Sequence, residues 1–396
     1  MSNLLNILTI NAISKAGLKR FPAHYKVGPK VDEPAAILVR SQNLHEMDIP
    51  ASVKAIGRAG AGVNNIPVEK MSKRGMPVFN APGANANAVK ELVIAALLIA
   101  SRNIAPALMF VAGLSGDDKT LHKRVEDGKK AFSGTELPGR TLGVIGLGKI
   151  GSLVADAAIK LGMNVIGFDP HITIDAAWSL PSAVKKANSI EEVLKASDYL
   201  TIHVPLLDAT RKLINAPRLA LMKEGSILLN FARDGIVDDE AVVEALRADN
   251  LRGYICDFPA QALQGAPRVI AMPHLGASTE EAEDNCAIMV ADQVRDFLEN
   301  GNIRNAVNLP DVVMDRESPY RLCIVNANVP NMVGQISTAM AGAGLNIHNM
   351  LNKSRGEMAY TLVDVDSAIP AELVSRLAAL EGVRSVRYLP LEAGKG

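Results

Sequence analysis

Three glycines and one aspartate form the stretch of this sequence with the clearest chemical meaning. The glycines follow an apolar run in G-x-G-x-x-G spacing, and the aspartate ends the next apolar run; the residues are Gly146, Gly148, Gly151 and Asp169. In this pattern the first glycine permits a tight turn, the second lets the backbone approach a pyrophosphate, and the third lets a helix pack against its strand. An acidic residue about 20 positions after the glycines binds the ribose hydroxyls of the cofactor and repels a 2′-phosphate. The stretch therefore predicts NAD and not NADP.

The elements around these residues fall in the order that such a site needs. Residues 142–145 predict a buried strand, 149–161 an amphipathic helix and 165–168 a second strand. A glycine turn before a helix is common by itself and also fits a plain strand-turn-helix. The complete order of strand, glycines, helix, strand and acid favours the dinucleotide site.

Hydride chemistry on a small acid needs a proton donor or acceptor and a cation, and two residues are candidates. Arg233 and His274 each follow an apolar run that predicts a strand of the cofactor domain. Their loops should therefore open at the carboxyl edge of the sheet, where ligands of such folds bind. Imidazole exchanges protons near neutral pH, and guanidinium matches a carboxylate. A structural or surface histidine is the alternative for His274, and His203 is its rival.

Two further arginines lie at the ends of predicted strands near the N-terminus. Residues 36–39 run into Arg40, residues 53–56 run into a glycine-rich loop that contains Arg58, and residues 78–80 form a third strand. Because the carboxyl ends of parallel strands meet at one edge, Arg40 and Arg58 can share an anionic ligand. Solvated surface arginines are the alternative interpretation.

Composition excludes several classes of protein. The chain has 396 residues, 48% of them hydrophobic, with 42 basic and 42 acidic side chains. Two or three domains are expected, without nucleic-acid or membrane partners. Three scattered cysteines give no disulfide framework and no metal site, which favours a reducing cytoplasm. No signal peptide is expected at the N-terminus.

The remaining pattern divides the chain further. A long helix is expected over residues 88–102, and polar residues 113–140 predict irregular structure. Asp238 is expected to cap a helix, and Ser278 with Glu281 to form a capping box for a helix that ends at Asn300 and Gly301. Asparagine, proline and charge predict a linker over residues 301–319. Residues 320–396 show the βαββαβ order of ferredoxin-like domains.

Several motifs together resemble the D-2-hydroxyacid dehydrogenase family. They lie at residues 137–151, 203–215, 230–246 and 273–279. Residues 40–42, 57–66 and 80–92 resemble the members that act on 3-phosphoglycerate, and the C-terminal unit resembles an ACT regulatory domain. The resemblance implies an α/β protein in which a Rossmann-type, doubly wound cofactor domain is inserted in a smaller flavodoxin-like substrate domain. The implied domains are substrate-binding 1–91 with 282–310, NAD-binding 92–281, linker 311–319 and ACT 320–396.

The resemblance also implies roles for individual residues. Arg233 matches a substrate-binding arginine and His274 an acid/base histidine, whereas His203 matches a position beside the cofactor. The implied cofactor-binding residues are Gly146, Gly148, Lys149, Ile150, Gly151, Asp169, His203, Val204, Pro205, Phe231, Ala232, Arg233, Asp257, His274, Gly276 and Ala277. Substrate binding is implied for Arg40, Arg58, Ala59, Gly60, Asn64 and Asn80. Asn328 and Asn346 match positions that bind serine at a domain–domain interface.

The implied activity is NAD-dependent oxidation of 3-phospho-D-glycerate to 3-phosphohydroxypyruvate, the entry to serine synthesis, by a cytoplasmic homo-oligomer, dimer or tetramer. The alternatives are a hydroxypyruvate or glyoxylate reductase and a non-catalytic NAD-sensing protein. Gln261 stands where the family usually has a catalytic glutamate, and glutamine cannot stabilise an imidazolium. We therefore expect either a pH optimum that is more acidic than that of relatives with the glutamate, or a substitute carboxylate near His274. Asn331 stands where glycine is usual, which leaves serine inhibition open.

Overall fold

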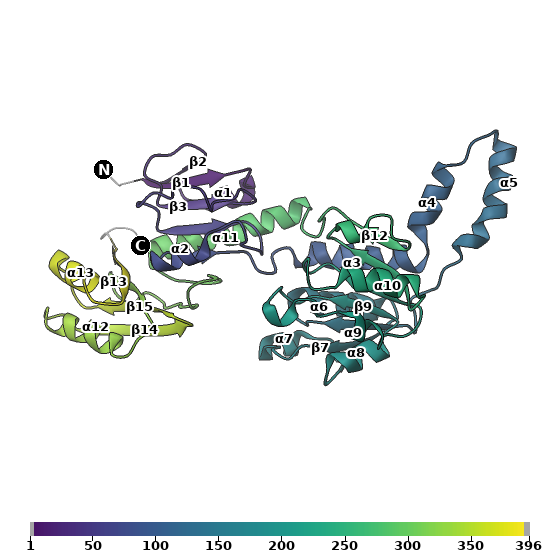
Figure 1. Ribbon diagram of the computed structural model, residues 1–396. Helices are drawn as coiled ribbons and strands as arrows, with labels where there is room; N and C mark the ends of the chain where they lie inside the picture. The colour runs from purple at the N-terminus through teal and green to yellow at the C-terminus, as the bar shows by residue number, and fades with distance from the viewer. Residues whose placement is uncertain (1–3, 392–396) are drawn as a thin grey trace. The chain divides into compact units, whose positions relative to one another are not determined.

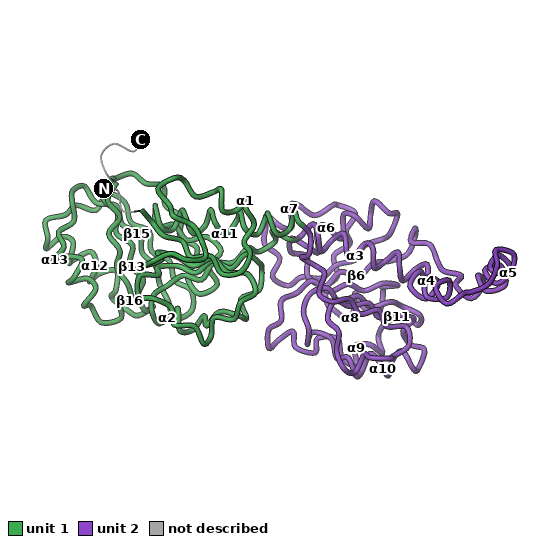
Figure 2. The backbone as a smooth tube through the Cα atoms, turned by 90° about the horizontal axis from the view of Figure 1, so that it is seen from above, with its two compact units in different colours: residues 1–85, 280–396 green, residues 86–279 purple. Residues whose placement is uncertain are grey.

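A computed structural model describes residues 4–391, and the chain folds into two compact units (Figures 1 and 2). Residues 86–279 form one unit, and the described residues on either side of this segment form the other. We call them the central unit and the flanking unit. The predicted domain boundaries at residues 91, 281, 310 and 319 stay a prediction.

The central unit is built on a seven-stranded parallel sheet of order β12-β11-β10-β9-β6-β7-β8. The strands are β6 (Thr141–Ile145), β7 (Asn164–Phe168), β8 (Val184–Lys186), β9 (Tyr199–Ile202), β10 (Ser226–Asn230), β11 (Leu251–Cys256) and β12 (Val269–Ala271). The chain moves outward from β6 to β8 and then returns to β9, on the other side of β6. The strand order therefore reverses between β6 and β9, which confirms the predicted doubly wound fold and marks the crevice where ligands bind.

Helices cover both faces of this sheet, which explains why its strands are apolar on both sides. One face carries α3 (Ala86–Ser101) and α6 (Lys149–Lys160), and the other carries α8 (Ile190–Ala196), α9 (Ala216–Leu219) and α10 (Asp239–Arg247). Strand β10 shows the alternation: Ile227 and Leu229 pack with α3 and α6, whereas Leu228 packs with α8 to α10. Short elements α7 (Ile174–Ser179), η2 (Asp208–Thr210) and η3 (Gln261–Leu263) complete the unit.

A helical arm replaces the irregular structure that the sequence predicts for residues 113–140. Helices α4 (Ile104–Ala112) and α5 (Asp118–Gly128), with η1 (Lys129–Phe132), project from the central unit (Figure 1). The prediction was wrong because Leu121 and Val125 are the only large apolar residues of α5, too few for the wide apolar face that identifies most helices. Its start signal is local: Asp117 accepts a hydrogen bond from the Thr120 backbone N–H at 2.9 Å.

Among the described residues, no single helix is long and apolar enough to cross a membrane. Helices α3 and α4 reach that length and hydropathy only together, and the chain bends by 67° between them.

The flanking unit contains a five-stranded parallel sheet of order β2-β1-β3-β4-β5. Its strands are β1 (Leu5–Ile10), β2 (Tyr25–Gly28), β3 (Ala36–Val39), β4 (Ala55–Arg58) and β5 (Val78–Phe79). The three predicted strands are confirmed, and β1 and β2 add two that the sequence analysis missed. Helices α1 (Lys15–Leu18) and α11 (Glu280–Asn300) pack on one face, and α2 (Val68–Lys73) packs on the other.

The C-terminal part of the flanking unit has the predicted βαββαβ order. It consists of β13 (Tyr320–Ala327), α12 (Met332–Ala341), β14 (Ile347–Arg355), β15 (Met358–Val365), α13 (Ala371–Ala378) and β16 (Val383–Pro390). The antiparallel order β14-β15-β13-β16 is ferredoxin-like, as expected. Leu322 and Ile324 pack beneath α12 and α13, whereas Cys323 and Val325 join the core around α11. The middle strands β13 and β15 of this sheet are therefore buried on both faces.

The predicted linker over residues 301–319 is packed against the core. Ile303, Leu309 and Val312 have no exposed surface, and Met314 is also buried. Ile303 and Val312 exchange backbone hydrogen bonds of 2.8 and 2.9 Å. The segment is irregular in its backbone but contributes side chains to the core shared by α11 and the C-terminal sheet.

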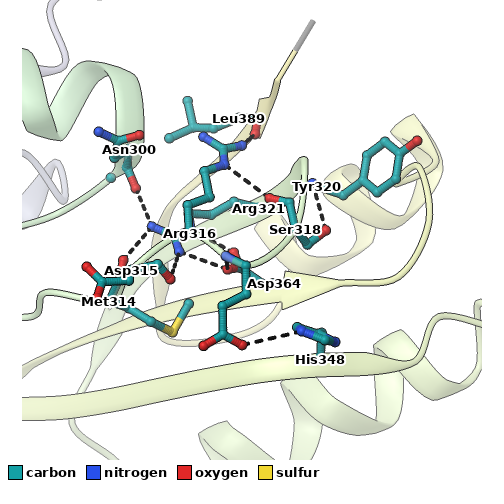
Figure 3. Close-up of polar contacts among 12 residues, drawn as sticks. Asn300, Met314, Asp315, Arg316, Ser318, Tyr320, Arg321, His348, Asp364 and Leu389 are labelled. Atoms are coloured by element: carbon teal, nitrogen blue, oxygen red, sulfur yellow. Dashed lines mark hydrogen bonds and ion pairs between the residues drawn. The ribbon is translucent and has the colours of Figure 1, made fainter. Parts of the chain in front are cut away.

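Arginines that follow α11 in the chain bind its last carbonyl groups, and Figure 3 shows the contact at Asn300. Arg321 donates to the Asn300 carbonyl, Arg316 to that of Glu299, and Arg387 to those of Phe297 and Leu298, at 3.0 to 3.2 Å. The carbonyls of Leu298, Glu299 and Asn300 would lack partners in a helix that simply ends, whereas that of Phe297 also accepts from the Gly301 N–H at 3.0 Å. Cations at this end also complement the helix dipole.

A buried ion pair orients Arg321 for this role. Its Nε and Nη2 atoms lie 2.6 and 2.8 Å from the two carboxylate oxygens of Asp364, and neither side chain has exposed surface. Two further N–H groups of Arg321 donate to the Met314 and Asp315 carbonyls. The guanidinium is therefore satisfied on every side, which is the condition for burying a charge without a large cost.

Two predicted helix caps differ from the structure. Asp238 precedes α10, but its carboxylate caps no backbone N–H and lies 3.0 Å from Lys212 Nζ. The long helix α11 begins at Glu280, so Thr279, and not Ser278, is the residue before its first turn. The predicted end at Asn300 and Gly301 is confirmed, with Gly301 at a φ of 76°.

We expect Asp364→Ala to destabilise the flanking unit by about 3–5 kcal/mol, because it leaves the buried Arg321 charge without its partner. Urea unfolding followed by circular dichroism would measure the loss. Asp292→Ala is the matched control, since it removes the partner of Arg20 from an exposed pair of 2.8 Å and should leave the midpoint nearly unchanged. Equal midpoints for the two variants would contradict the structural role given to Asp364.

Candidate active site

The glycine loop of the central unit has two structural glycines and one that faces open space. A Cβ atom on Gly151 would lie 2.0 Å from the Gly146 carbonyl oxygen, and one on Gly146 would lie 2.6 Å from the His203 carbonyl oxygen. Gly146 also has a φ of 91°, which side chains disfavour. A Cβ on Gly148 would meet nothing within 4 Å. Gly148 immediately precedes α6, so this open space lies where a pyrophosphate would meet the helix N-terminus.

Asp169 is held against the same loop. It follows β7, and its Oδ2 accepts a hydrogen bond from the Leu147 backbone N–H at 2.9 Å. Its Oδ1 accepts one from the His171 N–H at the same distance. The carboxylate is therefore fixed beside the glycine loop, and each oxygen keeps a lone pair for a ribose hydroxyl.

Arg233 lies in a loop that a buried asparagine shapes. Asn230, at the end of β10, donates its amide to the Arg233 carbonyl at 3.0 Å and accepts from the Ala232 N–H at 3.2 Å. The Arg233 guanidinium donates to the Ala232 carbonyl at 2.7 Å and forms no ion pair within the described residues. Partial burial lowers its pKa. A half-buried cation without a carboxylate partner suits an anionic ligand, and a substrate carboxylate matches its geometry.

The loop that carries His274 is fixed by Asp257. Asp257 follows β11 and is 1% exposed, and its two carboxylate oxygens accept hydrogen bonds of 2.7 Å from the Leu275 and Gly276 N–H groups. The His274 N–H donates to the Asp257 carbonyl at 3.1 Å. His274 itself has a φ of 56°, and its ring lies 5.0 Å from that of Phe258. A residue held in this rarely populated conformation marks a loop whose shape is over-determined by its surroundings.

His203, the rival of His274, lies in a setting that disfavours its charged form. Desolvation lowers the pKa of His203 to about 3. Its Nε2 lies 3.0 Å from Thr201 Oγ1, and its buried Nδ1 has no hydrogen-bond partner. A histidine that stays neutral at physiological pH is a poor proton donor, so the geometry favours the exposed His274 for that role.

Gln261 begins η3 and is exposed, and no hydrogen bond joins it to His274 among the described residues. The predicted pairing of these two side chains therefore stays a prediction.

The two N-terminal arginines lie on adjacent strands of the flanking unit. Arg40 follows β3, and Arg58 is the last residue of β4. Arg58 Nε donates to the Asn65 side chain at 3.0 Å, and the Asn65 amide donates to the Arg40 and Gln42 carbonyls at 3.3 and 2.7 Å. Asn65 thus connects the two arginine loops at the carboxyl edge, where the sequence analysis expects them.

The other predicted substrate residues lie around the same loop. Ala59 donates its backbone N–H to Val39, and Asn80 donates its amide to the Ala61 carbonyl at 2.6 Å. The Arg58 guanidinium passes over Gly60, where a Cβ atom would lie 2.3 Å from it. Asn64 is exposed, and its carbonyl lies 3.0 Å from His45 Nε2.

Comparison with known proteins shows to which family the chain is similar. Residues 104–276 match the family model described as "D-isomer specific 2-hydroxyacid dehydrogenase, NAD binding domain". A D-3-phosphoglycerate dehydrogenase of Haemophilus influenzae is 33% identical over 85% of this chain and 81% of its own length. One of Methanocaldococcus jannaschii is 36% identical over 85% of this chain. The chain belongs to the D-3-phosphoglycerate dehydrogenase family.

The chain spans 62% of the length of the Methanocaldococcus jannaschii family member. Among solved structures, an NAD⁺-bound 3-phosphoglycerate dehydrogenase of Entamoeba histolytica is 26% identical, with a TM-score of 0.58 over 76% of this chain and 98% of that one. A glyoxylate reductase of Paecilomyes thermophila shares the fold at 24% identity, with a TM-score of 0.64 over 76% of this chain and 98% of that one.

The two asparagines that the family resemblance assigns to an effector lie apart within one chain. Asn328 follows β13, beside the end where Ala327 pairs with Met358, and Asn346 precedes β14, beside the end where Ile347 pairs with Val365. They stand at opposite ends of the C-terminal sheet, roughly 25 Å apart by strand length. One chain therefore does not bring both to one ligand.

Sequence reasoning missed three residues that shape these loops: Asn65, Asn230 and Glu283. Asn230 carried a signal, since a buried amide at the end of an apolar run usually binds backbone groups. Glu283 carried none, because it contacts Arg40 across 243 positions of sequence.

Gly148→Ala should lower the affinity for NADH by roughly tenfold without lowering thermal stability, because its methyl group enters only the open space over α6. Gly151→Ala should lower both, because its methyl group meets a backbone carbonyl. Fluorescence titration with NADH and thermal melts would separate the two effects. Unchanged affinity in a stable Gly148→Ala variant would mean that no ligand passes over this backbone.

Proposed function

We propose that this protein catalyses the NAD-dependent oxidation of 3-phospho-D-glycerate to 3-phosphohydroxypyruvate, the first step of serine biosynthesis. The observation that carries the proposal is Arg233, a half-buried guanidinium without an acidic partner in the described part of the chain, in the loop after β10. The phosphoglycerate dehydrogenases that this chain resembles make the same substrate the best candidate.

Each residue has a chemical task in this reaction. Arg233 binds the substrate carboxylate and the oxygen on C2, which its planar fork can hold together. His274 takes the proton of the C2 hydroxyl as that oxygen becomes a carbonyl. NAD⁺ supplies the acceptor for the hydride that leaves C2. In the reverse direction His274 returns the proton to the carbonyl oxygen.

Arg40 and Arg58 are proposed to bind the phosphate of the substrate. Hydroxypyruvate and glyoxylate have no phosphate and would not require these two arginines. The residues of the glycine loop fit the cofactor: Gly148 leaves space for a pyrophosphate, and Asp169 offers its carboxylate to the ribose. That acid would repel the 2′-phosphate of NADP.

We further propose that the protein works as a homo-oligomer, as a dimer or a tetramer. Helix α4 of the arm exposes Leu108, Met109 and Val111 by 65%, 77% and 54%. A second copy of the chain is an occupant that would cover this apolar surface. A monomer in light scattering of the intact protein would contradict this. The three free, buried cysteines agree with the proposed cytoplasmic setting.

Serine is a proposed effector only in such an oligomer. Because Asn328 and Asn346 lie at opposite ends of one sheet, a ligand that touches both needs two chains.

The deciding experiment measures NADH oxidation with 3-phosphohydroxypyruvate, hydroxypyruvate and glyoxylate, each with and without serine. We expect the highest kcat/KM with the phosphorylated acid. His274→Asn should lose turnover by at least about 100-fold, the usual contribution of a general acid, while keeping its affinity for NADH. Equal or better rates with the unphosphorylated acids would favour a reductase. No turnover with any acid would favour an NAD-sensing binding protein.

Gln261→Glu should move the pH profile of the reduction to higher pH, because a carboxylate beside an imidazole stabilises the protonated form that donates the proton. The pH at which half of the maximal kcat/KM is lost would be compared with that of the wild-type protein. Gln264→Glu, on an exposed residue of the same segment, controls for added charge. An unchanged profile would remove Gln261 from the catalytic residues.

A further inference from the structure

Arg40, a proposed phosphate-binding residue, already has an anionic partner in the flanking unit. Its Nη2 lies 2.6 Å from Oε1 of Glu283, which is in the first turn of α11. The two side chains are 37% and 41% exposed, so solvent reaches this pair. An ion pair of this exposure is weak enough for a ligand to displace.

Glu283, on α11, contacts the first of two arginine loops that are joined to each other. Asn65 joins the Arg58 side chain to the Arg40 backbone, as described above. Cys286, one helical turn after Glu283, lies in the electrostatic field of Arg58, Arg40 and Glu283 together, and burial raises the pKa of its thiol. The two guanidinium groups and the one carboxylate therefore share a single small region at the end of β3 and β4.

Arg233 offers a contrast. No carboxylate pairs with it among the described residues, whereas Arg40 is bound by Glu283. A carboxylate near an anion site has two opposite effects. It orients the guanidinium, and its charge repels an incoming anion.

We infer that Glu283 is a specificity-determining residue that competes with the substrate phosphate for Arg40. The inference rests on the proposed function. The phosphate displaces the Glu283 carboxylate from Nη2 and forms its own charge-assisted hydrogen bonds with the guanidinium. Glu283 stays nearby on α11, so its charge weakens the hold on the phosphate. The result is a higher KM for phosphorylated acids and faster release of the phosphorylated product.

The proposed effect on KM comes from the negative charge of Glu283 and not from the shape of its side chain. A conservative substitution can separate these two contributions. Glu283→Gln keeps an oxygen that can accept the Arg40 hydrogen bond but removes the negative charge. We expect this variant to lower the KM for 3-phosphohydroxypyruvate by about two- to fivefold, the range of a partly exposed charge interaction. The KM for hydroxypyruvate should not change, and the difference should shrink at 1 M salt.

Asp292→Asn is the matched control, because Asp292 lies on the same helix and forms a similarly exposed pair with Arg20. It should leave every KM unchanged. Inhibition by inorganic phosphate gives a second readout, since its Ki should fall with Glu283→Gln in the same proportion as the KM. Glu283→Ala, which removes both the charge and the hydrogen bond, should also bind phosphate more tightly than the wild-type protein.

Two results would overturn the inference. An unchanged or higher KM for the phosphorylated acid in Glu283→Gln would show that the carboxylate does not compete. An equal fall in the Asp292→Asn control would show a general charge effect. Failure of the proposed function looks different: the wild-type protein would not prefer the phosphorylated acid, and the phosphate titrations of the variants would still report whether Glu283 competes for Arg40.

Discussion

The flanking unit depends on how the C-terminal end of α11 is satisfied. Its last four carbonyl groups are bound by Arg316, Arg321 and Arg387, and the buried pair of Arg321 with Asp364 orients one of these arginines. Figure 3 shows Arg321 with Asp364 and Asn300. Burying this charge costs several kcal/mol of desolvation, which the bidentate pair and the carbonyl contacts must offset. Such an arrangement tolerates little movement, because each displaced N–H would leave a buried polar group unpaired. The C-terminal sheet is consequently fixed to α11 and not suspended from a flexible linker.

The apolar core of the flanking unit reinforces this connection. Tyr360 and Leu362 of β15 pack with α11, and the Tyr360 hydroxyl donates to the Gly301 carbonyl at 2.6 Å. A side chain on Gly301 could not be accommodated, because a Cβ atom there would lie 2.3 Å from Cys323 Sγ. The same helix carries Glu283 in its first turn and the arginine-bound carbonyls in its last. Movement of the C-terminal sheet would therefore displace α11, and the N-terminal turn of this helix contacts Arg40.

Local patterns made much of the molecule predictable from sequence. The glycine loop, the succession of strand and helix around it and the βαββαβ unit could be predicted. Each is signalled by turn residues and by hydrophobic periodicity within about 30 positions of the sequence. Helix α5 was missed because Leu121 and Val125 are its only large apolar residues, and the packing of residues 301–319 was missed because their apolar side chains have no period. The contact of Glu283 with Arg40 could not be predicted, because the sequence does not indicate which charged residues far apart along the chain will form a pair. The effector asparagines were predictable by resemblance, but their placement at opposite ends of the sheet required the strand register.

Asp257 and Arg233 in the central unit and Arg40 in the flanking unit differ in how the fold satisfies their charges, and the difference follows their proposed roles. Asp257 receives two backbone N–H groups and shapes the His274 loop, so its charge serves structure. Arg233 receives only a neighbouring carbonyl, so its charge is left for a ligand that must be held firmly through the reaction. Arg40 receives a carboxylate exposed to solvent, so its charge is available only to an anion that outcompetes Glu283. Firm binding at the reacting end and weaker binding at the phosphate end would let the substrate be oriented without slowing release of the product.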